Sequence, residues 1–353
     1  MNTELMLVTA GDGARRRAVA NWLFVSAALV LIMVIVGGIT RLTESGLSMV
    51  HWEPITRWLP PLTDAAWMQE FQHYQQYPEY QKVNHGMSLD EFKAIFAWEF
   101  GHRLLGRVIG LVFTLPLVFF LLTGRIKWRE SPWFLVLLVL GGSQGVLGWF
   151  MVKSGLVDRP DVSQYRLAAH LSLAVFIYVL LIWTGLRWRK LSLAATFEPV
   201  SGPVRMTWIL LALVAVQIVL GAFVAGTNAG HQYNTFPLMD GDWFPEGLFV
   251  YDPAWLAPFE DRMTIQFLHR MLAYVIAVVA IWMIWQAWTR PSRQMALGVL
   301  LTILLQIILG VLTLIYVVPV SLGAMHQAGA LIALTAITHM LFGITAAGRR
   351  NRF

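Results

Sequence analysis

The 353-residue sequence contains no cysteine, which excludes disulfide bonds, iron–sulfur clusters and thiolate metal sites. Charged residues are also scarce: at 13% they reach about half of the roughly 25% that is typical of soluble domains. Hydrophobic residues make up 57%, and the 16 tryptophans suit a protein with two membrane–water interfaces. The net charge of +6 comes from short segments between apolar runs, so it does not indicate nucleic-acid binding. The composition predicts an integral membrane protein surrounded by lipid.

Eight apolar runs are each long enough to cross a bilayer as a helix, which takes about 20 residues. Helices are expected because lipid offers no hydrogen-bond partner to an open backbone. We therefore predict an all-α integral membrane protein with eight transmembrane helices. The predicted helices are residues 19–40, 100–123, 133–152, 166–186, 206–227, 264–288, 295–317 and 323–346.

The distribution of Lys and Arg predicts how the chain is oriented in the membrane. Basic residues gather in the segments that lie on the same side of the membrane as the N-terminus, at positions such as Arg15, Arg125 and Lys190. Residues 41–98 and 228–263, on the other side, carry few basic residues for their length. By the positive-inside rule, both termini are cytoplasmic and these two long loops lie outside. The first run has no cleavage site and follows too short a leader for an organellar transit peptide, so we expect a retained helix in a bacterial inner membrane.

Short motifs repeat between the two halves of the sequence, at matching positions in the apolar runs. The repeated motifs are GHRLL at 101–105 with LHRML at 268–272, QGVLG at 144–148 with QIILG at 306–310, and AHL at 169–171 with MHQ at 325–327. The fifth run adds QIVLG at 217–221, and the first run ends similarly in VGG at 36–38. We predict two tandem four-helix bundles with pseudo-twofold symmetry, formed by residues 1–195 and 196–353.

Four of the nine histidines lie near the outer ends of the even-numbered runs, two in each half, and we expect them at one depth. They are His102, His170, His269 and His326. Two imidazoles from facing helices are the usual way to hold a haem iron in a bundle, so we predict two haem-ligating pairs. Zinc is the main alternative, although two histidines leave it short of ligands and only Glu99 is near in sequence. Hydrogen bonding between helices is the alternative for any single histidine.

Three arginines follow the predicted ligands in the sequence. Arg103 and Arg107 come after the first histidine, and Arg270 comes directly after the third. Such side chains can neutralise the propionates of a haem at the outer surface. They can equally extend towards the interface, as arginines near helix ends commonly do. The sequence leaves both interpretations open.

Glu99 breaks the symmetry between the two halves. It lies three residues before His102 and therefore on the same helix face, whereas Gln266 occupies the matching position before His269. A carboxylate beside one site can handle protons there, while a glutamine cannot carry the charge. The alternative is a carboxylate that merely sits at the interface. The functional interpretation predicts one chemically active site and one plain electron-transfer site.

Several segments resemble the haem A synthase family, and the resemblance covers nearly the whole chain. The matching segments are residues 37–49, 52–56, 60–61, 99–107, 225–230 and 234–239. The long first loop resembles the proteobacterial and mitochondrial branch of that family. Some bacterial members carry a cysteine pair in this loop, and because this chain has none, a disulfide-based step cannot occur in it.

The resemblance implies an activity and a division of labour. The family oxidises the C8 methyl of haem O to a formyl group, which gives haem A for cytochrome c oxidase. Carried over to this chain, Glu99, His102 and His170 form the catalytic site that holds haem O, and His269 and His326 hold a permanent haem b. The implied partners are membrane lipid, haem O synthase as supplier of substrate and an unidentified electron donor, with a homo-oligomer left open. Two alternatives remain, a di-haem b electron-transfer protein and a haem transporter or chaperone.

Overall fold

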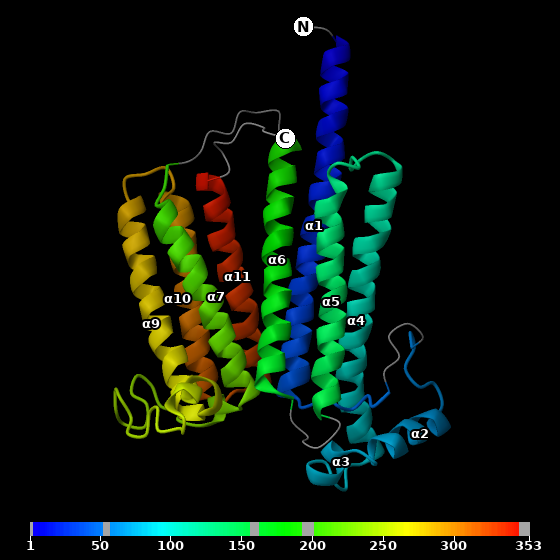
Figure 1. The fold of residues 1–353 in the computed structure, drawn as a ribbon, viewed down its shortest axis with the longest axis vertical. Coiled ribbons are helices and arrows are strands. Elements are labelled where there is room, and N and C mark those ends of the chain that lie inside the picture. The colour runs from blue at the N-terminus through cyan, green and yellow to red at the C-terminus, as the bar shows by residue number, and fades with distance from the viewer. Residues whose placement is uncertain (1–2, 52–56, 156–161, 193–200, 346–353) are drawn as a thin grey trace.

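The computed structural model describes residues 3–51, 57–155, 162–192 and 201–345. Within these ranges the regular structure is helical, with no strand. Eight helices are long and apolar enough to cross a membrane, which confirms the predicted fold class. They are α1 (Thr3–Leu42), α4 (Leu89–Leu122), α5 (Ser131–Gly155), α6 (Gln164–Ser192), α7 (Val204–Gly226), α9 (Arg262–Ala287), α10 (Arg293–Ile315) and α11 (Val320–Thr345), shown in Figure 1.

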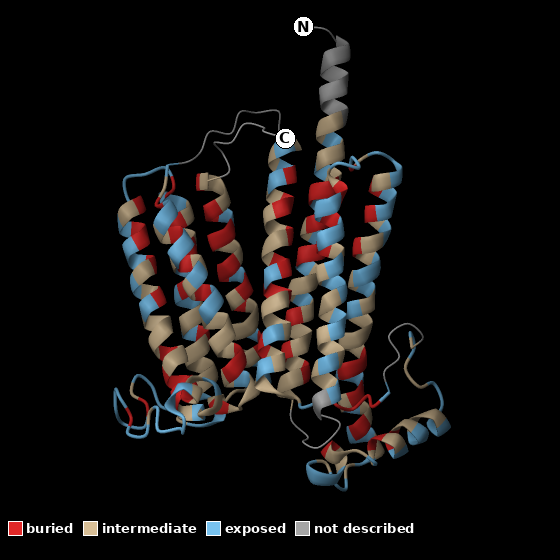
Figure 2. Cartoon of the chain, viewed as in Figure 1, coloured by how far each residue is buried: buried red, intermediate tan, exposed pale blue. Residues whose placement is uncertain are grey.

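The outward sides of these helices are apolar and exposed. Large hydrophobic side chains there include Leu115 of α4, Val139 of α5 and Trp285 of α9, which are 62%, 67% and 73% exposed. Figure 2 shows exposed positions running along α5 and α7 over most of the height of the bundle. An apolar surface of this extent is stable in lipid and unstable in water. The structure is therefore that of a multi-pass membrane protein.

The transmembrane helices form two groups that follow the sequence halves. Figure 1 shows α1, α4, α5 and α6 on one side and α7, α9, α10 and α11 on the other. Within the groups, α1 packs on α4 and α6, and α7 packs correspondingly on α9 and α11. Between the groups, α6 packs on α7, α1 packs on α11, and α6 packs on α11. Exchanging the halves converts the first of these contacts into the second and leaves the third unchanged, as pseudo-twofold symmetry requires.

The two long loops lie at the same end of the bundle (Figure 1). Each leaves its first helix through a residue in the left-handed region, Glu44 after α1 with φ of 51° and Asn228 after α7 with φ of 57°. Arg41 joins the two exits, because its Nη2 donates to Asn228 Oδ1 at 3.0 Å. The loops contain the short elements α2 (Asp64–Tyr74), α3 (Pro78–Lys82), η1 (Ala229–His231), η2 (Ala254–Leu256) and α8 (Ala257–Glu260).

α4 begins at Leu89, about three turns earlier than predicted. Ser88 and Glu91 form a capping box there: the Glu91 carboxylate accepts from the Ser88 amide at 2.8 Å, and Ser88 Oγ accepts from the Glu91 amide at 3.3 Å. The added turns pack Phe92 against Phe71 of α2. His102 consequently lies thirteen residues after the start of its helix. The prediction that the histidines lie near the outer ends of their helices is therefore wrong for His102, although it holds for the other three, which lie within two turns of a helix start.

Candidate functional site

Each of the four predicted ligand histidines lies against a glycine of the preceding transmembrane helix. A Cβ atom added to that glycine would lie 2.8–3.3 Å from the nearest atom of the imidazole ring. These ring-facing glycines are Gly37 for His102, Gly148 for His170, Gly221 for His269 and Gly310 for His326. The rings therefore pack directly on helix backbone, and a larger residue at any of the four glycines would displace its ring.

The histidines approach each other in the pairs that the repeat predicts. His102 lies within electrostatic range of His170, and His269 lies within electrostatic range of His326. All four residues are half-buried. The Nδ1 atoms of His170 and His269 are buried and have no hydrogen-bond partner. Each half thus brings together two imidazoles from different helices.

Three glutamines contact these histidines, and the sequence analysis gave them no role. Gln144 Nε2 donates to the backbone carbonyl of His170 at 2.8 Å, and Gln217 Nε2 donates to that of His269 at 2.9 Å. Gln306 Nε2 lies 3.1 Å from Nδ1 of His326. The signal that could have identified them is the repeated motif in which glutamine precedes the ring-facing glycine by four residues. Glutamine and glycine at this spacing share one helix face.

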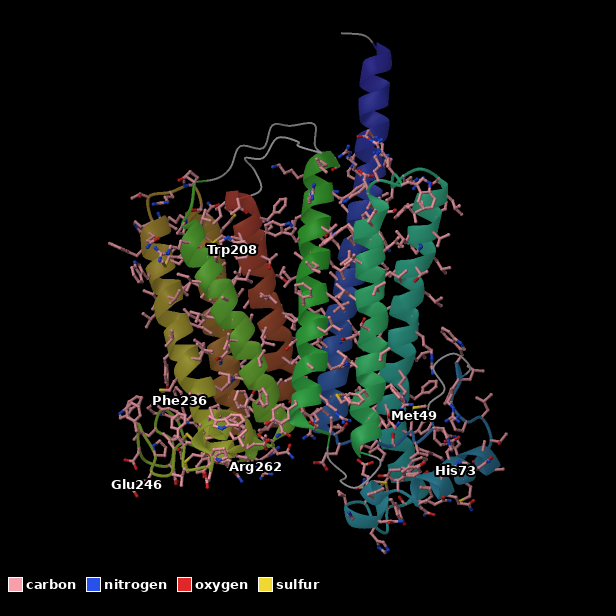
Figure 3. The ribbon with its side chains drawn as sticks, viewed as in Figure 1. Met49, His73, Trp208, Phe236, Glu246 and Arg262 are labelled. Carbon is pink, nitrogen blue, oxygen red and sulfur yellow. The ribbon has the colours of Figure 1, made fainter. Side chains whose placement is uncertain are left out.

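Glu99 is buried and accepts three hydrogen bonds. Its Oε2 atom accepts from Ser48 Oγ and from the backbone amide of Met49, both at 2.7 Å. Its Oε1 atom accepts from Arg103 Nη2 at 2.5 Å. Arg103 also donates to the backbone carbonyls of Met49 and His51 at 2.9 and 3.1 Å. The pair of Glu99 and Arg103 therefore fastens the start of the first outer loop to α4, in the region marked by Met49 in Figure 3.

Gln266 and Arg270 make the corresponding attachment in the second half. Gln266 Nε2 donates to the carbonyls of Ala229 and Gln232 at 2.9 and 2.7 Å, and Gln266 Oε1 accepts from Arg270 Nη2 at 3.1 Å. Arg270 also donates to three carbonyls of the second outer loop, those of residues 233, 235 and 238. The two attachments lie at the same end of the bundle, marked by Met49 in one half and Arg262 in the other (Figure 3). They differ in charge, because the first uses a carboxylate where the second uses an amide.

The three arginines thus bind loop backbone, a contact that neither sequence interpretation included. Arg107 Nη1 donates to the carbonyl of Arg57 at 2.5 Å, and its guanidinium lies 5.8 Å from the ring centroid of Trp58. Arg270 retains one buried Nε–H group without a partner. This donor suits the carboxylate of a propionate. Arg270 can therefore fasten its loop and meet an anionic ligand at the same time.

The paired histidines fit a haem better than they fit zinc. A haem iron takes two axial imidazoles, each of which commonly offers its second ring nitrogen as a donor. Within the described residues, no group of three or more His, Asp or Glu side chains could hold a metal ion. Those residues therefore do not form a zinc site with the usual three or four protein ligands. The ring-facing glycines let each imidazole pack directly on the backbone of the preceding transmembrane helix, which limits the positions that the ring can take.

The fold and the site together define a class, that of multi-pass membrane proteins with one histidine pair in each of two repeated helical halves. Within that class, the chain belongs to the family described as cytochrome oxidase assembly protein, whose model matches residues 20–338. A heme A synthase of Parvibaculum lavamentivorans is 49% identical over 328 residues, which cover 93% of this chain and 94% of the relative. Heme A synthases of Rhodospirillum centenum and Rhodopseudomonas palustris are 48% and 45% identical, over 91% and 94% of this chain and 87% and 90% of their own lengths. These findings confirm the family resemblance.

Proposed function

We propose that this chain is a haem A synthase, which oxidises the C8 methyl of haem O to a formyl group and so gives haem A for cytochrome c oxidase. The family and its named relatives support this activity. The observation in the structure that carries it is the difference between two otherwise equivalent sites. A buried carboxylate, Glu99, lies one helical turn from His102, and a neutral amide, Gln266, lies one turn from His269. A di-haem electron carrier would not require this difference.

The first half provides the substrate site. His102 and His170 hold haem O through its iron, and Glu99 provides a negative charge beside it. All three partners of Glu99 are donors, so the carboxylate acts as an acceptor in this arrangement. A fixed negative charge stabilises positive charge that develops on the macrocycle while its methyl group is oxidised.

The second half provides the site for a permanent haem b, with His269 and His326 as its ligands. A haem bound there supplies one-electron transfer. Gln266 leaves this site without a carboxylate, and the free Nε–H of Arg270 is available for a propionate. The second site therefore pairs its arginine with an amide and leaves the positive charge of Arg270 for a propionate, an arrangement that suits a tightly held electron-transfer haem.

The site lies between transmembrane helices, where a lipid-soluble substrate can reach it from the membrane. We infer that the chain lies in a bacterial inner membrane with both termini in the cytoplasm, so that both loop attachments face the outer side. Haem O carries an isoprenoid tail, and its supplier is a haem O synthase in the same membrane. The electron-transfer partner is a separate component. The basic segments that lie on the same side of the membrane as the N-terminus support this orientation.

Pigment extraction from the purified, detergent-solubilised protein tests the proposal. A haem A synthase should contain haem B together with haem O or haem A. Haem B alone, at two per chain, would instead support the di-haem electron carrier. A protein that loses all of its haem to an apo-globin acceptor within minutes would support the transporter or chaperone.

A further inference from the structure

The three glutamines near the ligand histidines occupy one repeated position. Gln144, Gln217 and Gln306 each precede a ring-facing glycine by four residues, so both side chains of a pair lie on the face that meets the histidine helix. Each amide nitrogen contacts the histidine at its backbone carbonyl or its ring. Gln217 does both, because its Nε2 also lies 3.3 Å from Nε2 of His269.

The amide oxygens of these glutamines are hydrogen-bond acceptors that still lack a donor. Oε1 of all three is buried and has no hydrogen-bond partner. An unpaired buried acceptor is costly, and an imidazole that binds iron through one nitrogen has an N–H on the other to donate. Because the two ends of an amide exchange by a half-turn, Gln306 can present Oε1 to Nδ1 of His326 across the 3.1 Å contact. This would fix the tautomer and the ring orientation of the ligand.

Gly329 makes room for the amide of Gln306. It lies three residues after His326 on α11, and a Cβ atom added to it would come within 2.3 Å of Gln306 Oε1. The contact is with the end of a flexible side chain, so an alanine at this position would move the amide and leave the helices in place. The amide position is thus set by a glycine that packs against it, which indicates a constrained group.

His102 is the one ligand histidine without such a glutamine. Met33 precedes Gly37 by four residues and therefore occupies the glutamine position of α1. Its Cε lies 3.4 Å from the Cβ position of Gly106, one turn beyond His102. A thioether is at best a weak acceptor, so it cannot hold an imidazole N–H as an amide does.

We propose that Gln144, Gln217 and Gln306 are positioning residues that orient three of the four axial histidines, and that His102, with Met33 in place of a glutamine, is the least constrained ligand. The inference rests on the proposed function. It divides the four iron bonds unequally: both ligands of the haem b site are braced, but only one ligand of the substrate site is. A permanent cofactor is held more tightly when the rings of both ligand histidines are fixed by hydrogen bonds. A substrate that must leave as product needs at least one bond between histidine and iron that breaks readily.

The test uses the full-length, haem-loaded protein and two substitutions at one position. Gln306→Met gives the second site the residue of the first, and Gln306→Glu keeps an acceptor while making it stronger. Loss of haem b to an apo-globin acceptor should be about 10–100-fold faster in Gln306→Met. The midpoint potential of haem b should rise in Gln306→Met and fall in Gln306→Glu, because a stronger acceptor at Nδ1 makes the imidazole a more basic ligand. A purely structural role would not move the potential in opposite directions.

Two glycine variants provide a matched comparison in the same region. Gly329→Ala should displace the amide and shift the potential in the direction of Gln306→Met. Gly298→Ala on α10, where an added Cβ meets nothing within 4 Å, should leave both readouts unchanged. Wild-type potentials and haem loss in both Gln306 variants and in Gly329→Ala would overturn the inference while leaving the proposed function intact. If the wild-type protein bound no bis-histidine haem b, the proposed function itself would fail.

Met33→Gln tests the inference in the first half. The added amide should slow the release of haem from the substrate site about tenfold or more and leave the haem b potential unchanged. A release rate that is unchanged or faster, in a protein that melts at the wild-type temperature, would contradict the assignment of His102 as the least constrained ligand.

Discussion

Glu99→Gln separates the charge of Glu99 from its size. In the native chain, Oε2 accepts from Ser48 Oγ and the Met49 amide, and Oε1 accepts from Arg103. A glutamine has one oxygen, so it can serve Arg103 or the loop but not both. If the oxygen faces Arg103, the new NH₂ group opposes the amide of Met49, which cannot accept a hydrogen bond. Ser48 can turn its hydroxyl to accept instead.

The structural cost of this change has two parts: one buried, unsatisfied amide, which amounts to about 1–3 kcal/mol, and the loss of the counter-charge of the nearly buried Arg103. Arg103 keeps its hydrogen bonds to the carbonyls of Met49 and His51, so the change should loosen the start of the first outer loop without unfolding the helices. The catalytic cost should be greater. Loss of a preorganised electrostatic group beside a reacting centre commonly reduces the rate by about 10²–10³-fold. We therefore expect Glu99→Gln to fold, to bind haem b, and to accumulate haem O or a partly oxidised haem.

The assay is the ratio of haem A to haem O in membranes that contain equal amounts of each variant. Ser48→Ala is the matched control, because it removes one loop contact and keeps the carboxylate. It should retain most of the haem A yield, whereas Glu99→Gln should lose nearly all of it. Equal losses in the two variants would show that Glu99 acts only by fastening the loop. A near-normal yield in Glu99→Gln would refute any role of the charge.

Three further predictions follow from the fold. Reporter fusions after Arg129 should be cytoplasmic and fusions near Asp252 external, and the reverse pattern would overturn the proposed orientation. Gly310→Ala should displace the ring of His326, because its Cβ would lie 2.8 Å from Cε1, and haem b content should fall; full haem b content would contradict the close packing. Burial raises the pKa of Tyr74 above its ordinary value of about 10, so the first outer loop should lose stability as pH rises above 10. Limited proteolysis of the loop measures this loss, and the same alkaline loss in a Tyr74→Phe variant would show that Tyr74 is not its cause.

The transmembrane helices could be predicted from the sequence because lipid imposes a simple rule. A helix of about 20 apolar residues satisfies its own backbone hydrogen bonds across the bilayer, and the eight runs reflect this. The true start of α4 could not be predicted from hydropathy, because its first three turns carry Asp90, Glu91 and Lys93 among the apolar residues and do not extend the apolar run. The capping box of Ser88 and Glu91 was a readable signal for the true start.

The histidine pairs could be proposed from the repeat, whereas the groups around them could not. Glu99 could be predicted to lie on the same helix face as His102, but its partners Ser48 and Met49 lie about fifty residues away in a loop. Such contacts depend on how the loop returns to its helix, which no local pattern encodes. The contact of Gln306 with His326 likewise depends on the register between α10 and α11. The repeated motif predicted the two halves of the chain, and it assigned no contact to the glutamine that it contains.

The central claim is that the two histidine pairs hold different haems. The most direct test is the pigment content of four purified alanine variants at the ligand positions, with His339→Ala as a control on the same helix as His326. Replacing His269 or His326 should remove haem B. Replacing His102 or His170 should leave haem B bound and abolish haem A. Loss of the same pigment to the same degree in all four ligand variants, with His339→Ala unchanged, would contradict the division of labour between the two halves.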